Sequence, residues 1–249
     1  MIGIVLAAGY ATRLYPLTKD RPKPLLPVAG RPIIDYIVDE MDTLSELKQI
    51  IVVTNHRFAA AFEEWAAIRN QSGLKPVLVV DDQTTDDSNK LGAIGDIQFC
   101  IDRLKIDDEL LVIAGDNLFT YRLKDADDFY RTSQEDTLLA RSVSPPEDLT
   151  RYAIVELDAN GRVISLEEKP KQPKSNMAVF ATYFYSRDTV PLIAQYLKEG
   201  NSPDAPGHFP VWLYQRKPVR VYLFDGICID IGTPESYAEV QVTYRPVRD

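Results

Sequence analysis

The chain has 249 residues, which is enough to bury a core as one large domain or two small ones. Apolar residues make up 45% and charged residues 26%, as in ordinary globular proteins, and no apolar run is long enough to cross a membrane. A net charge of −9 argues against general nucleic-acid binding. Cys100 and Cys228 lie far apart, and the apolar start lacks the basic residues of a signal peptide. We therefore expect a cytoplasmic protein without a disulfide.

Positive charge is concentrated at the start of the chain. Residues 1–31 contain five cations and one acid, for a net charge of +4, so the remainder carries −13. A small cationic segment in an acidic chain suits a compact polyanion such as a nucleoside triphosphate. On composition alone, a solvated basic loop is the favoured interpretation.

The first half of the chain alternates strand patterns with helix patterns. We expect strands at Ile2–Leu6, Gln49–Thr54, Pro76–Val80 and Glu109–Ala114, and helices with Pro32 at the first helical position, at Phe58–Ile68 and at Ile94–Leu104. This alternation predicts an open parallel sheet wrapped by helices, in which ligands bind beyond the carboxyl ends of strands. Gly9 and residues 115–117 both lie at such ends.

The second half is richer in strands. We expect a hairpin of Tyr152–Leu157 and Arg162–Leu166 around Asn160-Gly161, strands at Val179–Tyr185, Val219–Phe224 and Ile227–Ile231, and helices at Asp188–Leu197, capped by Asp188, and at Pro234–Val242. The expected fold is therefore one α/β domain over 1–249. It has a Rossmann-like open sheet, mixed but mostly parallel and flanked by helices, with a β-rich lid.

The opening segment carries the strongest chemical signal. The strand Ile2–Leu6 breaks into Ala7, Ala8 and Gly9, and small residues let a backbone approach a ligand closely. Backbone N–H groups can then face phosphate. Thr12, Arg13 and Lys23 follow within a proline-punctuated loop. This arrangement predicts a triphosphate-binding loop.

Six segments together resemble one family. They are LAAGYATRLYPLTKDRPKPLLPVAGRP at 6–32, LGAIGD at 91–96, GDN at 115–117, EEKP at 167–170, YFY at 183–185 and DIGTPESY at 230–237. In this order they resemble the sugar-1-phosphate nucleotidylyltransferases, closest in pattern to the glucose-1-phosphate thymidylyltransferases. The resemblance implies that residues 1–120 mainly bind nucleotide, while 121–249 mainly bind sugar phosphate and close the site.

The resemblance implies a Mg²⁺-dependent reaction. An oxygen of the sugar 1-phosphate attacks the α-phosphorus of a nucleoside triphosphate, with dTTP or UTP favoured, and pyrophosphate leaves. The nucleophile is already an anion, so no general base is needed, and cations and positioning supply the catalysis. We accordingly expect His56 and His208, the two histidines of the sequence, to be structural.

Two aspartates are expected to hold the metal ion. Asp116 follows a strand, although a Gly-Asp-Asn sequence is also a common turn. Asp230 lies in an apolar strand, where an unpaired carboxylate would be costly, although a buried salt bridge would also explain it. Both match metal-binding aspartates of the family, and carboxylate oxygens suit Mg²⁺.

The remaining roles follow from matching positions in the family. Arg13 is expected to grip the leaving pyrophosphate and Lys23 the nucleotide phosphates. Lys169 is expected to hold the sugar phosphate and Glu168 the sugar hydroxyls. Other nucleotide contacts are expected from Leu6, Ala7, Ala8, Gly9, Thr12, Gln83, Gly92 and Asp116, and other sugar-phosphate contacts from Tyr152, Ala153 and Val179.

Several positions depart from the family pattern. Ala11 replaces a glycine, and Asp96 stands where a small residue is usual. Phe180 and Ala181 lie where the family has a segment that commonly ends in glycine, which adds bulk and removes polarity near the expected sugar pocket. The acceptor could therefore be a deoxygenated sugar or a smaller phosphate ester.

Two other functions remain open at this stage. One is a CTP-dependent cytidylyltransferase acting on a non-sugar phosphate ester, and EEKP and YFY argue for a sugar instead. The other is a catalytically silent nucleotide-binding subunit, which retention of the phosphate and metal residues argues against. A homo-oligomer is compatible with the apolar residues of the C-terminal half, and neither nucleic acid nor membrane is expected as a partner.

Overall fold

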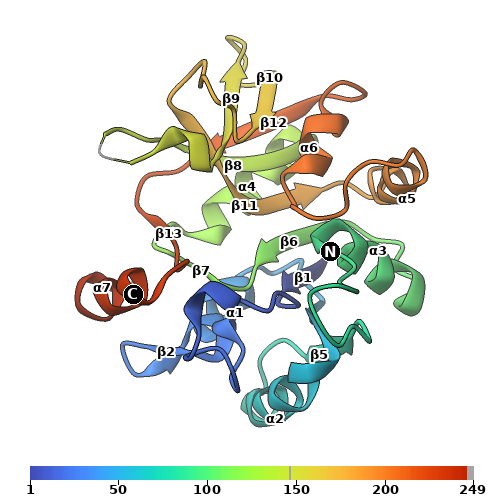
Figure 1. Cartoon of the computed structure of the whole chain (residues 1–249). Coiled ribbons are helices and arrows are strands. Elements are labelled where there is room, and N and C mark those ends of the chain that lie inside the picture. The colour runs from blue at the N-terminus through green and yellow to red at the C-terminus, as the bar shows by residue number, and fades with distance from the viewer. Residues whose placement is uncertain (146, 246–249) are drawn as a thin grey trace.

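The computed structural model describes residues 1–145 and 147–245, and within them a large mixed sheet forms the centre of the molecule (Figure 1). Along its main path the strands run β10 (Val163–Glu168), β9 (Ala153–Leu157), β11 (Met177–Tyr185), β6 (Leu110–Ala114), β1 (Ile2–Leu6), β4 (Gln49–Thr54) and β5 (Val77–Asp81). β6, β1, β4 and β5 are parallel to one another, whereas β11 runs antiparallel to β6. The predicted fold class, a mixed open sheet flanked by helices, is confirmed.

Helices cover both faces of the sheet. One face packs against α1 (Ile33–Asp42), α2 (Ala59–Arg69) and α4 (Leu123–Ser133), and the other packs against α3 (Ala93–Leu104), α5 (Val190–Lys198) and α6 (His208–Leu213). Successive side chains of a strand point to opposite faces of the sheet and so pack in both layers. Val5 of β1 packs in the first layer and Ile4 in the second. A third cluster joins α1 to α7 (Pro234–Thr243) at one side of the molecule.

β11 joins the two halves of the chain. One of its edges pairs with β8 (Asp136–Ser142), which in turn pairs in parallel with β12 (Val219–Leu223). Its other edge is shared, because 182–185 pair with β6 whereas 178–179 pair with β9. The register with β8 shifts between Phe180 and Tyr183, as at a β-bulge. The sheet therefore parts between β6 and β9, beside the carboxyl end of β6.

A small two-stranded sheet brings distant residues to that same end. β7 (Asn117–Phe119) pairs antiparallel with β13 (Cys228–Asp230), and the register sets Asp230 opposite Asn117. Asp116 directly precedes β7, so the fold places these two aspartates together although 113 residues separate them in the sequence. A capping box at Thr233 then starts α7.

The N-terminus of α3 is tied to the second half of the chain. The backbone N–H groups of Ala93 and Ile94 donate to the carbonyl oxygens of Asp204 (3.0 Å) and Pro203 (2.9 Å). Gly92, with φ +79°, makes the close approach possible, because a Cβ there would lie 2.6 Å from the Pro203 oxygen. The loop 203–204 therefore closes one side of the space between the halves.

Most predicted elements are present with shifts of one or two residues, and two details are wrong. Pro32 lies just before α1 in an extended conformation, as the last residue of β3 (Arg31–Pro32), which pairs with β2 (Pro27–Val28). Asp188 does not cap α5; the cap position belongs to Thr189, and the Asp188 carboxylate accepts hydrogen bonds from Ser186 and Lys217 instead.

The cysteines and helices agree with the expectations from composition. Cys100 and Cys228 are buried and unlinked. In the described part of the chain, no helix combines the length and apolar character needed to cross a membrane. The last four residues of the predicted domain, 246–249, lie outside the described residues.

Candidate active site

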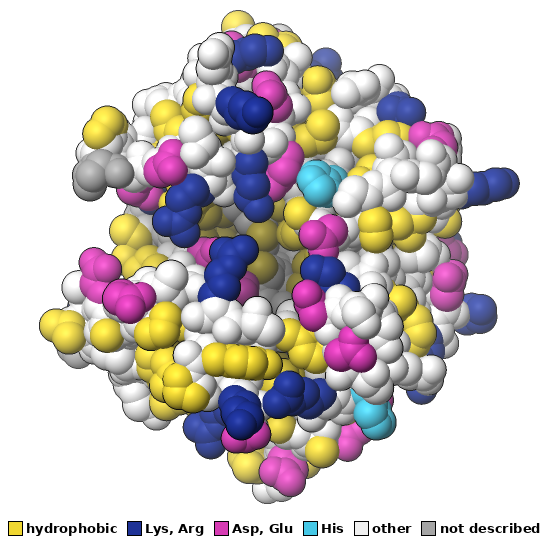
Figure 2. Space-filling model, viewed as in Figure 1, with side chains coloured by type: hydrophobic (Ala, Val, Ile, Leu, Met, Phe, Trp, Pro, Cys, Tyr) yellow, Lys and Arg dark blue, Asp and Glu magenta, His cyan; other side chains and the backbone are white. Residues whose placement is uncertain are grey.

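Two cavities meet in the cleft between the halves of the chain. The first, of about 500 Å³, lies between the loop after β1, the residues that follow β5 and the start of α3. The second, of about 690 Å³, lies between the β9–β10 hairpin and β11. They share the residues Arg13, Ala114, Asp116, Pro206 and Asp230. Figure 2 shows the hollow on this face, with lysine and arginine side chains around its rim. We call the first the nucleotide cavity and the second the acceptor cavity.

The loop after β1 is held in shape by buried polar contacts. The fully buried Asn55 donates from Nδ2 to the Ala8 carbonyl oxygen (2.8 Å), and the Thr18 hydroxyl donates to the Ala11 carbonyl oxygen (2.7 Å). Ala11 has φ +46° and ψ 43°, the left-handed conformation, and a 3-10 helix, Thr12–Leu14, follows. The loop thereby presents Gly9 and Arg13 to the nucleotide cavity, and the Arg13 side chain is exposed.

Lys23 joins the two aspartates at the meeting point of the cavities. Its Nζ lies 2.8 Å from Asp116 Oδ2 and 2.8 Å from Asp230 Oδ1. Lys23 is only 5% exposed, whereas the aspartate side chains are open to the cleft. Burial lowers the pKa of Lys23, but the attraction of the two carboxylates outweighs it and raises the pKa above its ordinary value. The ammonium is therefore charged.

The two aspartates suit a divalent cation bound together with phosphate. The described residues contain no cluster of three or more His, Cys, Asp or Glu side chains arranged to hold a metal ion. Mg²⁺ commonly takes only one or two carboxylates from a protein and completes its shell with substrate phosphates and water. Asp116 and Asp230, at the edge shared by both cavities, fit that pattern.

Glu168 and Lys169 line the acceptor cavity from the end of the hairpin. Glu168 ends β10 opposite Ala153 of β9 and is mostly buried. Lys169 follows with φ +47°, and its backbone N–H donates to the Tyr152 carbonyl oxygen (3.1 Å). Its ammonium is exposed and lies 3.7 Å from Glu168 Oε1. Among residues 1–145 and 147–245 this is the one ion pair of Lys169, so its ammonium is available to an anion in the cavity.

Arginine side chains add positive charge to the wall of the acceptor cavity around Phe180. The Arg141 guanidinium lies over the Phe180 ring, 5.3 Å from its centroid, and its Nη2 donates to Glu147 Oε2 (2.7 Å). The Tyr152 ring also packs against Phe180, with the two ring centroids 5.3 Å apart. Arg151 lines the same cavity, is exposed, and forms no salt bridge within 4.0 Å to any described residue. The bulk expected from Phe180 is present, but the wall also carries cationic side chains.

The structure brings nearly all the predicted site residues to the two cavities. The nucleotide cavity is lined by Leu6, Ala7, Ala8, Gly9, Thr12, Arg13, Lys23, Gly92, Asp116 and Asp230, and the acceptor cavity by Tyr152, Ala153, Glu168, Lys169 and Val179. Gln83 is the exception. It has φ +68°, is exposed and lines neither cavity, and its neighbour Asp82 lines the nucleotide cavity instead.

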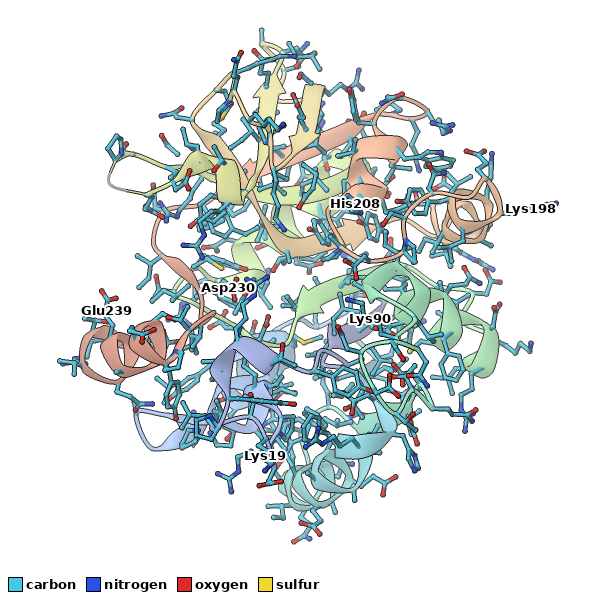
Figure 3. The ribbon with its side chains drawn as sticks, in the orientation of Figure 1. Lys19, Lys90, Lys198, His208, Asp230 and Glu239 are labelled. Atoms are coloured by element: carbon cyan, nitrogen blue, oxygen red, sulfur yellow. The ribbon has the colours of Figure 1, made fainter. Side chains whose placement is uncertain are left out.

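Several residues that line the cavities were not predicted from the sequence. In the nucleotide cavity they are Asp82, Asp87, Lys90 and Asp204, and in the acceptor cavity Arg141, Glu147 and Arg151. Figure 3 shows Lys90 and Asp230 on opposite sides of the cleft. Arg141 lies on β8, which no sequence pattern predicted, and the acidic segment 81–87 has no period that singles out the side chains facing the cavity.

Known proteins match almost the whole chain. The family model described as "Nucleotidyl transferase" matches residues 2–246. The glucose-1-phosphate thymidylyltransferase of Neisseria meningitidis is 32% identical, over 96% of this chain and 81% of that protein. The glucose-1-phosphate adenylyltransferase of Geobacillus stearothermophilus is 26% identical, over 97% of this chain and 65% of that protein. The structure of a UDP-glucose pyrophosphorylase complexed with UDP-glucose shares the fold, with a TM-score of 0.80 at 23% identity, covering 96% of each chain.

Proposed function

The chain belongs to the nucleotidyl transferase family, and from that premise we propose that it transfers a nucleoside monophosphate from a triphosphate to a sugar 1-phosphate. Pyrophosphate is released and a nucleotide sugar forms. We propose dTTP or UTP as the donor, supported by the 32% identity to a thymidylyltransferase. The observation that carries the proposal is the meeting of two cavities at Arg13, Asp116 and Asp230.

The two cavities divide the substrates between them. The triphosphate would lie along the loop after β1, with its phosphates towards Arg13 and Lys23. The sugar 1-phosphate would lie against the hairpin, with its phosphate towards Lys169 and its hydroxyls towards Glu168. The shared edge then holds the attacking oxygen close to the α-phosphorus, which replaces a bimolecular encounter with a positioned one.

Charge neutralisation is the main catalytic task of these residues. Two polyanions must approach each other, and negative charge grows on the departing pyrophosphate. The attacking phosphate oxygen is already ionised, so no side chain has to remove a proton from it. Arg13 offers a planar fork to the pyrophosphate portion, and Lys23 offers a buried point charge beside Asp116.

We further propose that Asp116 and Asp230 hold Mg²⁺ when the triphosphate is bound. Their oxygens face the edge that both substrates would share. A magnesium ion there would offset the charge of the phosphates. The Lys23 ammonium already donates hydrogen bonds to the same two carboxylates, so these carboxylates together bind a positive charge.

A matrix of reactions tests the proposed function. Each common nucleoside triphosphate would be incubated with each of a range of sugar 1-phosphates and with phosphocholine, with and without Mg²⁺, and pyrophosphate release measured. We expect release with dTTP or UTP and a sugar 1-phosphate, dependent on Mg²⁺. Release only with CTP and phosphocholine would overturn the sugar assignment, and triphosphate binding without release from any pair would indicate a silent subunit.

Substitution of the aspartates tests their role within that reaction. Asp116→Asn and Asp230→Asn should each lower turnover by about a hundredfold or more while the circular dichroism spectrum is retained. The matched control is Asp225→Asn, an exposed aspartate near Asp230 that lines neither cavity. Full activity of either test variant at saturating Mg²⁺ would contradict the metal assignment.

A further inference from the structure

Two aromatic rings and a carboxylate stand together in the wall of the acceptor cavity. They belong to Tyr152, Phe180 and Glu147, and we call these three residues the aromatic box. The ring centroids lie 5.3 Å apart, with the rings inclined by 49°. The Tyr152 hydroxyl donates to Glu147 Oε2 (3.4 Å). Aromatic faces attract cations and bind choline-type ligands in many proteins, and a carboxylate adds to the attraction. The aromatic box therefore has the composition of a site for an alkylammonium group.

Arg141 fills the aromatic box with a cation of the chain itself. Its guanidinium lies over the Phe180 ring, 5.3 Å from the centroid. Its Nη2 donates to Glu147 Oε2 (2.7 Å), the same oxygen that accepts from Tyr152. Its Nη1 donates to the Ser142 carbonyl oxygen (3.2 Å). The Arg141 side chain is only 15% exposed, so it is fixed in the wall by these contacts. A ligand cation would find its place taken.

The Arg141 guanidinium still has hydrogen bonds to offer. A guanidinium carries five N–H donors, and the described residues accept one bond from Nη1 and one from Nη2. Nε is buried and has no partner among the described residues. Because Arg141 lines the acceptor cavity, the second N–H groups of Nη1 and Nη2 can donate to oxygen atoms of a bound acceptor.

The other charges of the acceptor cavity act in the same direction. Each of the four acidic side chains that line it already has a cationic partner from the chain. The pairs are Asp116 and Asp230 with Lys23, Glu147 with Arg141, and Glu168 with Lys169. Arg13 and Arg151 also line the cavity and form no salt bridge within 4.0 Å to any described residue. The charge that remains for a ligand is therefore positive.

We propose that Arg141 determines the class of acceptor, because it admits phosphate esters whose remaining part is neutral or anionic and excludes those that carry an ammonium group. The assignment rests on the proposed function, since it concerns the molecule that would receive the nucleotide. Hydroxyl oxygens of a sugar accept hydrogen bonds from the guanidinium. An ammonium group would meet a like charge in place of free aromatic faces, and two like charges about 4 Å apart lower affinity by about tenfold or more.

Two phosphate esters of the same shape test the proposal. Phosphocholine carries a trimethylammonium group, and 3,3-dimethylbutyl phosphate carries a neutral tert-butyl group in its place. Each is titrated calorimetrically into the protein with Mg²⁺ and an α,β-methylene analogue of UTP or dTTP, which cannot release pyrophosphate, and glucose 1-phosphate serves as the reference. We expect wild type to bind the neutral ester at least about tenfold more tightly than phosphocholine.

Variants of Arg141 separate its charge from the rest of the cavity. Arg141→Ala empties the aromatic box, so the preference for the neutral ester should fall about tenfold or reverse. Arg141→Lys keeps a positive charge and should keep the wild-type preference. Arg216→Ala is the matched control. Arg216 also stacks on an aromatic ring, that of Trp212 (3.9 Å), and pairs with Glu199, but it lines neither cavity.

The contrary outcomes are distinct. Equal affinity of wild type for the two esters, or an unchanged preference in Arg141→Ala, would overturn the assignment. Circular dichroism checks that the variant is folded, and Arg141→Gln, which keeps N–H donors without the charge, replaces it if it is not. Failure of wild type to bind glucose 1-phosphate or either ester would instead contradict the proposed function.

Discussion

Ala11 occupies a backbone conformation that residues with a Cβ adopt only at a cost. Its φ of +46° lies in the left-handed region, where an L residue pays about 1–2 kcal/mol. The conformation is maintained by the hydrogen bond from Thr18 and by the 3-10 helix that starts at Thr12. Ala11 lines the nucleotide cavity, and backbone strain of this kind is common at functional sites.

Replacing Ala11 with Gly should therefore stabilise the protein by about 0.5 kcal/mol, because relief of strain exceeds the added entropy of the unfolded chain. Urea denaturation measures the change. The matched control is Ala67→Gly, the same substitution at an exposed position of the right-handed helix α2, which should destabilise by about 1 kcal/mol. Equal losses in both variants would show that Ala11 is not strained.

Lys169 can be tested separately from the nucleotide residues. Its ammonium reaches the acceptor cavity and not the nucleotide cavity, so Lys169→Ala should raise the KM for the sugar 1-phosphate about tenfold or more while the Kd of the triphosphate stays the same. Lys171→Ala, two residues further on and outside both cavities, should behave as wild type. A selective loss of triphosphate affinity would reverse the assignment.

Individual residues show which parts of the candidate site could be predicted from the sequence alone. Lys23, Asp116 and Lys169 lie in segments that resemble the family, so motif order placed them correctly at the cavities. Gln83, which was predicted to contact the nucleotide, lines neither cavity, and its neighbour Asp82 lines the nucleotide cavity. A polar loop has no period that tells which side chain turns inwards, and the left-handed φ of Gln83 sets this.

Helix α3 depends on the second half of the chain for its start. The carbonyl groups of Pro203 and Asp204 take the place of a side-chain cap, and Gly92 approaches them so closely that no side chain fits. A helix whose first N–H groups are satisfied by a distant loop is positioned by that loop. Asp96, in the first turn of α3, is positioned together with the helix.

Gly92→Ala should destabilise the protein by about 3 kcal/mol and lower its thermal midpoint. The new Cβ would meet backbone atoms of Pro203 and Asp204 at 2.6–2.9 Å in addition to the strain of φ +79°. Gly200→Ala provides the matched control, because φ there is +81° but no atom lies within 4 Å. It should cost about 1–2 kcal/mol from strain alone. Equal costs would show that the contact with the loop is unimportant.

Among the helices and strands, the buried apolar segments could be predicted from the sequence, whereas the polar segments could not. β1 and β4 match their predicted bounds because all their central residues are apolar and buried. Helix α4 buries only Leu123, Ala126, Asp127 and Tyr130 in an otherwise polar sequence, and it was not predicted. β8, beside it, was missed as well. The branching of the sheet at β11 follows from pairing between distant segments, which no local pattern contains.

For the molecule as a whole, the cleft contains cationic side chains although the chain carries a net charge of −9. The two cavities are lined by eight acidic side chains and by the cations Arg13, Lys23, Lys90, Arg141, Arg151 and Lys169. The negative net charge disfavours long polyanions, whereas the individual cations of the cleft can contact a small anion. Stability also depends on charge, since a carboxyl buried with its proton is less tolerant of alkaline conditions than an ion-paired one.

The unfolding free energy should therefore contain a contribution from Asp96 that falls as pH rises. Its pKa is about 8 in the folded chain and 3.8 ordinarily, so the folded state binds more protons between those values. The contribution is lost between about pH 4 and pH 8, by at most about 1.4 kcal/mol per pH unit. Urea unfolding of wild type and Asp96→Asn at pH 5 to 8 should give a difference that changes steadily with pH. Parallel curves would show that Asp96 is ionised in the folded protein.

The hydrogen bonds from the start of α3 to the loop 203–204 also bear on motion. The two halves of the chain cannot separate at this point without releasing the amide hydrogens of Ala93 and Ile94 to solvent. Their exchange with deuterium consequently follows the frequency with which the cleft opens there. Two backbone positions of the native sequence thus report, without any label, whether a substrate arrives at an open cleft and leaves it closed.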